Sequence, residues 1–327
     1  MSLADPAAAR PSLLMGTDRA FVAASRLAAL ALLATLLALA SPSFLTFGNL
    51  ANVMKQASLQ FVMSAGLTAV VITGGIDLSI GAVIGLSACL GGSLLAGGSI
   101  FGGVFAALGV GLACGVFNGV MIAYVRIPSF IATYGMLWIA FGLGYVFMMG
   151  EVIYGFPPAF RFIATGSIGP VPMLVVMAAL VLAAMHVILT RTPFGRALYA
   201  IGGNANAARL SGMPVQRRLV MCYALSGLVA GVAALLVIAR TNAADAGLGE
   251  ELLLPIIAAV AVGGTSLAGG TGGVVGTAIG ATILTLIING MNLLGVKTFW
   301  QAFAMGTLIL ISVATDEIIR RRRSHVA

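Results

Sequence analysis

Long uncharged, apolar runs alternate along this chain with short polar connections. Ten such runs lie near residues 21 to 41, 56 to 73, 78 to 97, 101 to 125, 130 to 149, 171 to 189, 218 to 239, 252 to 268, 272 to 293 and 299 to 316. A bilayer core about 30 Å thick takes roughly 20 apolar residues in each helical span, so the pattern predicts an all-α, polytopic membrane protein. Because Gly74, Gly75 and the glycine-rich stretch 263–276 interrupt four of the runs, we expect eight to ten transmembrane helices, some broken by glycine.

The composition excludes an ordinary soluble enzyme. Of the 327 residues, 60% are hydrophobic and 8% are charged, whereas a soluble domain carries roughly 25% charged residues. The net charge of +8 comes from short basic clusters between uncharged stretches, which is not the distribution of a nucleic-acid-binding surface. Three scattered cysteines and two histidines indicate neither a disulfide framework nor a metal site.

Motifs of nucleotide binding and catalysis are missing from the sequence. Neither lysine, Lys55 nor Lys297, follows a glycine, so the chain has no GK[ST] phosphate loop. It also has no G-x-S-x-G or HExxH motif. We therefore expect a transport protein rather than an enzyme, without an ATP site of its own.

The distribution of basic residues predicts the orientation. An even number of spans places both termini on one side, and thirteen basic residues then fall on that side, against Lys55, Arg161, Arg240 and Lys297 on the other. The side richer in Lys and Arg is usually cytoplasmic. We therefore expect a cytoplasmic tail over residues 1–20, a membrane domain over 21–316 with a cytoplasmic loop at 190–217, and a basic cytoplasmic tail over 317–327.

One segment between the second and third runs carries a carboxylate inside the apolar part of the chain. A lone charge in lipid costs several kcal/mol, so Asp77 should face protein, water or a helix end. It could cap a helix that begins at Leu78, or it could line a pathway, and a broken helix would allow both roles. A similar glycine-rich stretch at 263–270 suggests an internal repeat with the pathway at its interface. The candidate pathway residues are Thr73, Gly74, Gly75, Asp77, Ser79, Asn118 and Asn289.

The basic loop at 190–217 is the longest connection on the expected cytoplasmic side. Between its glycines and prolines, the pattern predicts two short helices over 197–201 and 205–210. Helices of this kind could dock in the groove of a partner protein. They could also lie at the membrane surface with their arginines reaching toward headgroups, and the loop alone favours this second arrangement.

Several segments in matching order resemble the permease subunits of ribose/xylose-type ABC importers. Residues 74–81 are similar to that family's GGIDLSVG signature, with Ile80 in place of valine. Further similar segments lie at 115–119, 126–136, 195–212, 249–252 and 263–270, and the resemblance runs from Phe44 to Asp316. The chain departs from the family's usual residues at Ser129, Tyr134 and Pro255.

The resemblance implies a permease subunit in the bacterial inner membrane that carries a monosaccharide or a related small polar solute. A second permease copy, a cytoplasmic ABC ATPase that holds ATP and Mg²⁺, and an exterior sugar-binding protein would be its partners, and the chain itself would need no cofactor. The loop at 190–217 would then couple to the ATPase. The coupling residues would be Gly195, Arg196, Gly202, Asn204, Arg209 and Gly212, and the binding-protein docking residues would be Glu151, Arg161, Asp245 and Glu250.

A second interpretation is an ion-coupled secondary transporter in which Asp77 is the coupling carboxylate. Carriers of that kind usually hold several ionisable residues within the membrane, and this chain offers one. The sequence does not identify the sugar, and it leaves both a homodimer and a heterodimer open.

Overall fold

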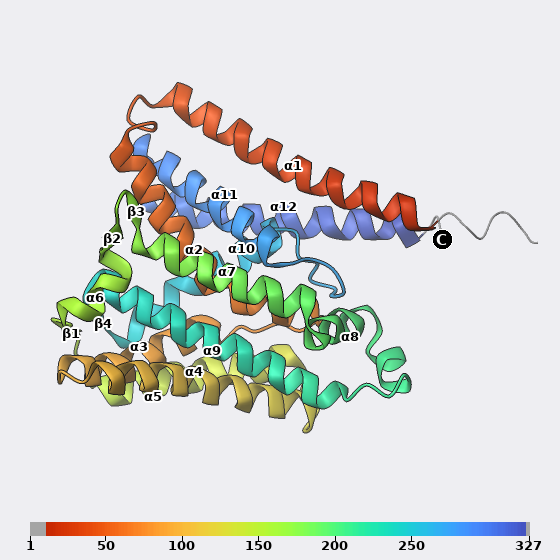
Figure 1. Cartoon of the computed structure of the whole chain (residues 1–327), viewed down its shortest axis with the longest axis horizontal. Helices are drawn as coiled ribbons and strands as arrows, with labels where there is room; N and C mark the ends of the chain where they lie inside the picture. The colour runs from red at the N-terminus through yellow and green to blue at the C-terminus, as the bar shows by residue number, and fades with distance from the viewer. Residues whose placement is uncertain (1–10, 325–327) are drawn as a thin grey trace, which may run out of the picture.

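The computed structural model describes residues 11–324, and most of them are helical (Figure 1). The helices in chain order are α1 (Pro11–Ala40), α2 (Phe47–Ile72), α3 (Ile80–Ala96), α4 (Ile100–Ala123), α5 (Ser129–Met148), α6 (Pro158–Thr165), α7 (Met173–Arg191), α8 (Pro193–Leu210), α9 (Val215–Thr241), the 3₁₀-helix η2 (Ala246–Leu252), α10 (Leu253–Val262), α11 (Val274–Leu293) and α12 (Thr298–Ser324). The strands are β1 (Ile153–Tyr154), β2 (Ser167–Ile168), β3 (Val171–Pro172) and β4 (Ala243–Ala244).

Each of the ten predicted apolar runs contains a helix, which confirms the all-α membrane class. Among the described residues, six helices are long and apolar enough to cross a membrane: α4, α5, α7, α9, α11 and the Thr298–Thr315 part of α12. Both predicted tails include part of a terminal helix. Helix α1 begins at Pro11 and α12 continues to Ser324, while residues 1–10 and 325–327 lie outside the described part of the chain.

Two helices beside the glycine-rich stretches are shorter than a full span. The predicted span over 252–268 is not a continuous helix, because α10 ends at Val262, where Gly263 and Gly264 follow and Gly264 has φ +70°. Helix α3 has 17 residues, or about 25 Å of helix, which is less than a hydrocarbon core of about 30 Å. Both helices therefore have one end inside the protein.

Helix α9 lies at the centre of the bundle, and α4 packs against it through glycines. A Cβ atom on Gly227 would overlap the carbonyl group of Gly111, and a Cβ atom on Gly231 would lie 2.7 Å from the carbonyl oxygen of Ala107. Glycines one turn apart let two helix backbones touch, so dispersion contacts form between main chains. The four-residue glycine spacing in these helices is thus explained by packing within one chain.

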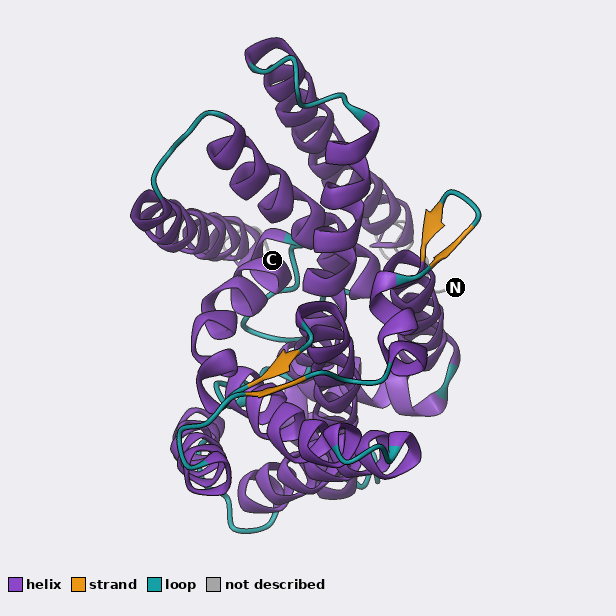
Figure 2. Ribbon diagram, turned by 90° about the vertical axis from the view of Figure 1, so that its left-hand side faces the viewer, coloured by secondary structure: helices purple, strands orange, loops and turns teal. Residues whose placement is uncertain are grey.

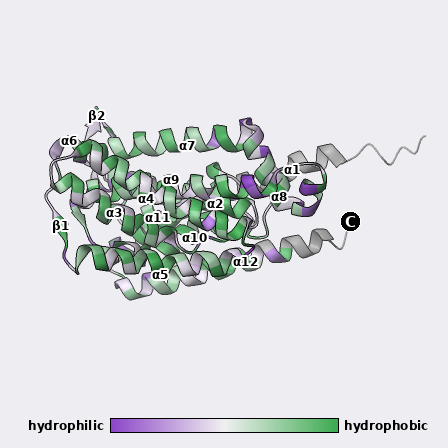
Figure 3. Ribbon diagram, turned by 90° about the horizontal axis from the view of Figure 1, so that it is seen from below, coloured by the Kyte–Doolittle hydropathy of each residue, from purple (hydrophilic) through white to green (hydrophobic). Residues whose placement is uncertain are grey.

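The two ends of the bundle differ. The start of α1 and the end of α12 lie at the same end as α8 (Figure 1), where hydrophilic residues gather on the hydropathy view (Figure 3). The opposite end faces the viewer in Figure 2 and carries two small antiparallel sheets, β1 with β4 and β2 with β3. The first sheet joins distant parts of the chain, because Ile153 pairs with Ala244 and Tyr154 pairs with Ala243.

We expect Gly227→Ala to lower the thermal unfolding temperature of the purified protein. The added methyl group meets main-chain atoms of α4, and overpacking of this kind costs about 1–3 kcal/mol or more. Gly109→Ala, on the exposed side of α4, is the matched control, because nothing lies within 4 Å of a Cβ atom there. It should leave stability unchanged or raise it by up to about 1 kcal/mol. Equal shifts for the two variants would contradict the packing explanation.

Candidate functional site

The segment between α2 and α3 is unwound inside the protein. Helix α2 ends at Ile72, and Gly74 then adopts φ +77°, a conformation that favours glycine. Helix α3 does not resume until Ile80. The predicted helix start at Leu78 is therefore wrong by two residues, because the Leu78 N–H donates sideways to Thr133 Oγ1 at 3.1 Å.

Hydroxyl groups from other helices replace the hydrogen bonds that this backbone lacks. The Ile76 N–H donates to Ser129 Oγ at 3.3 Å, and Thr133 Oγ1 lies 3.3 Å from the Ile76 carbonyl oxygen. Tyr223 of α9 donates to the same carbonyl oxygen at 3.4 Å. Sequence reasoning missed Thr133 and Tyr223. The four-residue spacing of Ser129 and Thr133 at the start of α5 was the signal that was available.

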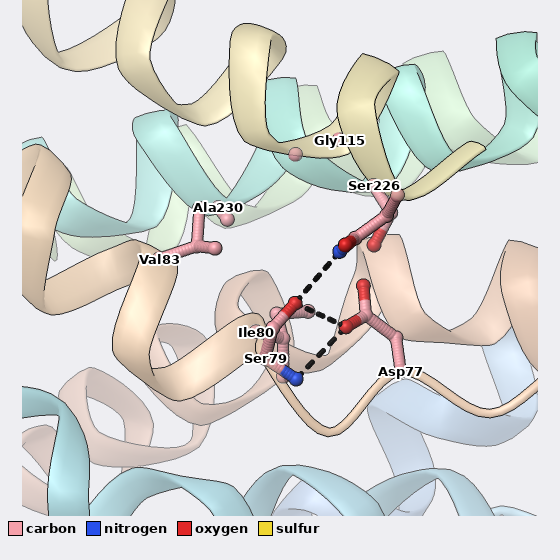
Figure 4. A pocket seen from close by; sticks show the side chains of 9 residues that line it. Asp77, Ser79, Ile80, Val83, Gly115, Ser226 and Ala230 are labelled. Carbon is pink, nitrogen blue, oxygen red and sulfur yellow. Dashed lines mark hydrogen bonds between the residues drawn. The ribbon is translucent and has the colours of Figure 1, made fainter. Parts of the chain in front are cut away.

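Asp77, Ser79 and Asn118 form a buried hydrogen-bonded chain (Figure 4). The Ser79 N–H and Oγ–H donate to Asp77 Oδ1 at 2.9 Å and 2.6 Å, and Asn118 Nδ2 donates to Ser79 Oγ at 2.9 Å. Asp77 thus binds the backbone N–H just before α3, so it stabilises the turn that leads into the helix. These three side chains and Ser226 of α9 line one narrow pocket between α3, α4 and α9.

Asn289 lies in a different place from this cluster. Its side chain and that of Asn49 donate to each other, with Asn289 Nδ2 to Asn49 Oδ1 at 2.8 Å and Asn49 Nδ2 to Asn289 Oδ1 at 3.2 Å. Asn49 is near the start of α2 and Asp77 follows its end, about 35 Å of helix away. The structure therefore brings together Asp77, Ser79 and Asn118 of the predicted pathway residues, but not Asn289.

The second glycine-rich stretch, between α10 and α11, lies directly against the first. The Gly270 N–H donates to the Ile72 carbonyl oxygen at 2.9 Å, at the end of α2. A Cβ atom on Gly269 would lie 2.8 Å from the backbone nitrogen of Gly74. The two stretches that the sequence singled out thus meet through their main chains.

The predicted cytoplasmic loop forms α8, which consists of two helical pieces. Asn204 has φ −161° and ψ 99° and breaks the helix, and its Oδ1 accepts hydrogen bonds from the N–H groups of Asn206 and Ala207, each at 3.0 Å. This is the N-cap arrangement that begins a helix. The expectation of two short helices is confirmed, although the first begins earlier, at Pro193.

The first piece of α8 is docked on both glycine-rich stretches. A Cβ atom on Gly202 would overlap the Ile72 carbonyl group, and Gly270 lies beside it. The buried side chains of Leu198 and Ile201 hold this piece against the bundle, and Tyr199 donates to the Gly272 carbonyl oxygen at 3.0 Å. Sequence reasoning did not foresee Tyr199, Ile72 or Gly270 in this contact.

The second piece of α8 projects away from the bundle. Arg209 is exposed, Leu210 is 89% exposed, and Gly212 follows with φ +80° in the exposed turn before α9. Arg196 is also exposed, whereas Gly195 is buried against the last turn of α7. Of the predicted coupling residues, Gly195 and Gly202 therefore contact the bundle, Asn204 shapes α8, and Arg196, Arg209 and Gly212 lie on its surface.

The predicted docking residues lie at the opposite end, around the β1–β4 sheet. Glu151 precedes β1 and Asp245 follows β4, so the sheet brings the two segments together. Glu250 on η2 accepts a hydrogen bond from the Tyr145 hydroxyl group at 3.0 Å, and Glu151 and Glu250 are both exposed. Arg161, on α6, is half-buried.

Comparison with known proteins identifies the family. A family described as "Branched-chain amino acid transport system / permease component" matches residues 49–313. The ribose import permease protein RbsC of Escherichia coli (strain K12) is 38% identical over 295 residues, which cover 89% of this chain and 92% of that protein. RbsC of Bacillus subtilis (strain 168) is 40% identical over 290 residues, covering 87% of this chain and 89% of that protein.

A further relative is the galactose/methyl galactoside import permease protein MglC of Escherichia coli (strain K12). It is 33% identical over 303 residues, which cover 86% of this chain and 90% of that protein. No solved structure matches the chain. With its bundle of apolar helices and a match over most of its length, the chain belongs to the family of permease components of branched-chain amino acid transport systems.

Proposed function

We propose that this chain is the membrane-spanning subunit of an ABC importer that carries a monosaccharide or a related small polar solute. Its relatives are named as ribose and galactose import permeases, and a further relative is named as a probable ABC transporter permease. The observation that carries the proposal is the position of α8. One side of this helix pair contacts the backbones of both unwound stretches, and its second piece is exposed at the end of the molecule.

In this proposal α8 transmits the movement of a cytoplasmic ATPase to the pathway. Gly202 meets the Ile72 carbonyl group and Gly270 without an intervening side chain, so a displacement of α8 displaces both main chains. Closely packed interiors transmit such shifts rather than absorbing them. Ile72 ends α2, and the chain from there leads directly to Asp77. The α8 end, with the start of α1 and the end of α12, is then the cytoplasmic side of a bacterial inner membrane.

The partners follow from the same arrangement. The chain has no GK[ST] loop, so ATP and Mg²⁺ would be held by the ATPase. The acidic residues Glu151, Asp245 and Glu250 at the opposite end, together with Arg161 of α6, would steer the exterior sugar-binding protein toward its docking position. A second permease copy would complete the pathway. The solute is uncharged, which suits a site made of hydroxyl and amide groups beside a single carboxyl group.

Uptake into proteoliposomes tests the energy source. With the ATPase and the binding protein present, we expect accumulation of labelled sugar that requires ATP and survives collapse of the proton and sodium gradients. Accumulation by the permease alone, driven by either gradient and abolished with it, would instead support the ion-coupled transporter that uses Asp77.

We expect Gly202→Ala to uncouple transport from ATP hydrolysis. The added methyl group meets the Ile72 carbonyl oxygen, and overpacking costs about 1–3 kcal/mol, where 1.4 kcal/mol is a factor of ten. ATP-driven uptake should therefore fall, by about tenfold for each 1.4 kcal/mol of lost contact between α8 and the two stretches, while the ATPase still co-purifies and hydrolyses ATP. Gly203→Ala is the matched control, because nothing lies within 4 Å of a Cβ atom at that neighbouring glycine. Equal uptake by the two variants would argue against coupling through Gly202.

The exposed second piece of α8 is tested separately. Leu210→Glu places a charge on a side chain that is 89% exposed, so it should leave the permease folded but reduce co-purification of the ATPase. Leu45→Glu makes the same change at a side chain that is 62% exposed in the turn between α1 and α2, at the other end of the bundle, and should leave assembly unchanged. Unchanged assembly of Leu210→Glu would place the ATPase contact elsewhere.

A further inference from the structure

The pocket at Asp77 contains buried oxygen atoms that have no hydrogen-bond partner. Both hydrogen bonds of the carboxyl group, from the Ser79 N–H and Oγ–H, go to Oδ1. Asn118 uses its amide N–H toward Ser79 Oγ, which leaves its buried Oδ1 without a partner. The buried Ser226 Oγ also has no partner. In Figure 4 the second carboxyl oxygen of Asp77 points to the side of the pocket where Ser226 lies.

No positive charge compensates Asp77 within the part of the chain that the structure describes. The titratable groups that face it are the thiols of Cys114 on α4 and Cys222 on α9, and the phenol of Tyr223 on α9. On α5, the polar groups next to this segment are the hydroxyl groups of Ser129 and Thr133, which accept hydrogen bonds from the backbone N–H groups of Ile76 and Leu78. All of these groups are neutral in their ordinary protonation states near neutral pH. An ionised carboxylate here would be a buried and unpaired charge, which is strongly unfavourable.

The pocket also encloses no space in which a water molecule could supply the missing partner. The space between Asp77, Ser79, Asn118 and Ser226 does not admit a sphere of water size. A bound water would need such a space and two or more polar partners. A proton needs no volume, and it converts one acceptor into a donor.

We propose that Asp77 binds a proton on Oδ2 in this conformation. The proton comes from water, converts the carboxylate to a carboxylic acid, and gives the pocket an O–H donor for Ser226 Oγ, whose own O–H is then free to donate to the unpartnered Asn118 Oδ1. Asp77 Oδ1 continues to accept both bonds from Ser79, so the turn before α3 is unchanged. The site is thus a neutral network of hydrogen bonds rather than a buried charge.

The bound proton links this site to movement of the surrounding helices. Separation of α3, α4 and α9 would admit water, and water stabilises the ionised carboxylate, so the acid would release its proton. The closed arrangement is therefore favoured as the pH falls, and the open one as it rises. This linkage goes beyond the proposed function, because proton binding at Asp77 requires neither the ATPase nor a sugar.

Infrared difference spectroscopy of the purified full-length permease in lipid tests the proposal. Near neutral pH, the wild type should show the C=O stretching band of a protonated carboxyl group, and this band should shift in D₂O. Asp77→Asn should lose the band. Ser226→Ala should retain it at a shifted frequency if its oxygen accepts from the acid. Glu251→Gln, at an exposed carboxylate, is the control and should leave the band in place.

A wild-type spectrum with only carboxylate bands would overturn the proposal. So would a protonated band that persists in folded Asp77→Asn protein. If that variant does not fold, selective ¹³C labelling of aspartate in the wild type gives the same answer, because an isotope shift assigns the band to an aspartic acid. Transport gives a second readout, independent of the spectrum. An asparagine at this position mimics the protonated acid, so the part of the pH dependence of ATP-driven uptake that arises here should be absent in Asp77→Asn.

Discussion

Backbone groups that leave a helix inside a membrane must find hydrogen-bond partners within the protein, because lipid offers none. This constraint shapes the centre of the structure. Between α2 and α3 the chain is unwound, and the side chains of Ser129, Thr133 and Tyr223 supply partners for its N–H and C=O groups. Since these side chains come from α5 and α9, the unwound segment can exist only while both helices are in place.

Glycine has two physical roles in this protein. In the bundle it brings α4 and α9 into main-chain contact, which stiffens the centre against which other helices rest. In the two unwound stretches it allows backbone conformations with positive φ, as at Gly74 and Gly264, and lets those stretches touch each other. The same absence of a side chain at Gly202 lets α8 rest on both stretches. A movement of α8 therefore reaches the pathway segment through backbone atoms, which have few alternative positions.

The buried cluster around Asp77 depends on how the unwound segment, α4 and α9 pack against one another. Asp77 sits on the unwound segment, Asn118 on α4 and Ser226 on α9, so the pocket exists only when these three elements are close. A carboxyl group enclosed in this way responds to any change that admits water. The polar site and the helix packing therefore depend on each other, although no side chain of α8 reaches Asp77.

The sequence by itself determined the helical membrane class, the approximate positions of the spans and the segments that carry polar residues, because these depend on the local pattern of apolar residues and glycine. It also predicted the two helical pieces of α8, since Asn204 and the nearby glycines act on the backbone of their own segment. Only the tertiary structure decided that Asn289 pairs with Asn49, that the two unwound stretches touch, and that Tyr199 and Gly202 rest on them. Contacts of this kind join residues far apart in the chain, and they are set by the way whole helices pack, which no local pattern contains.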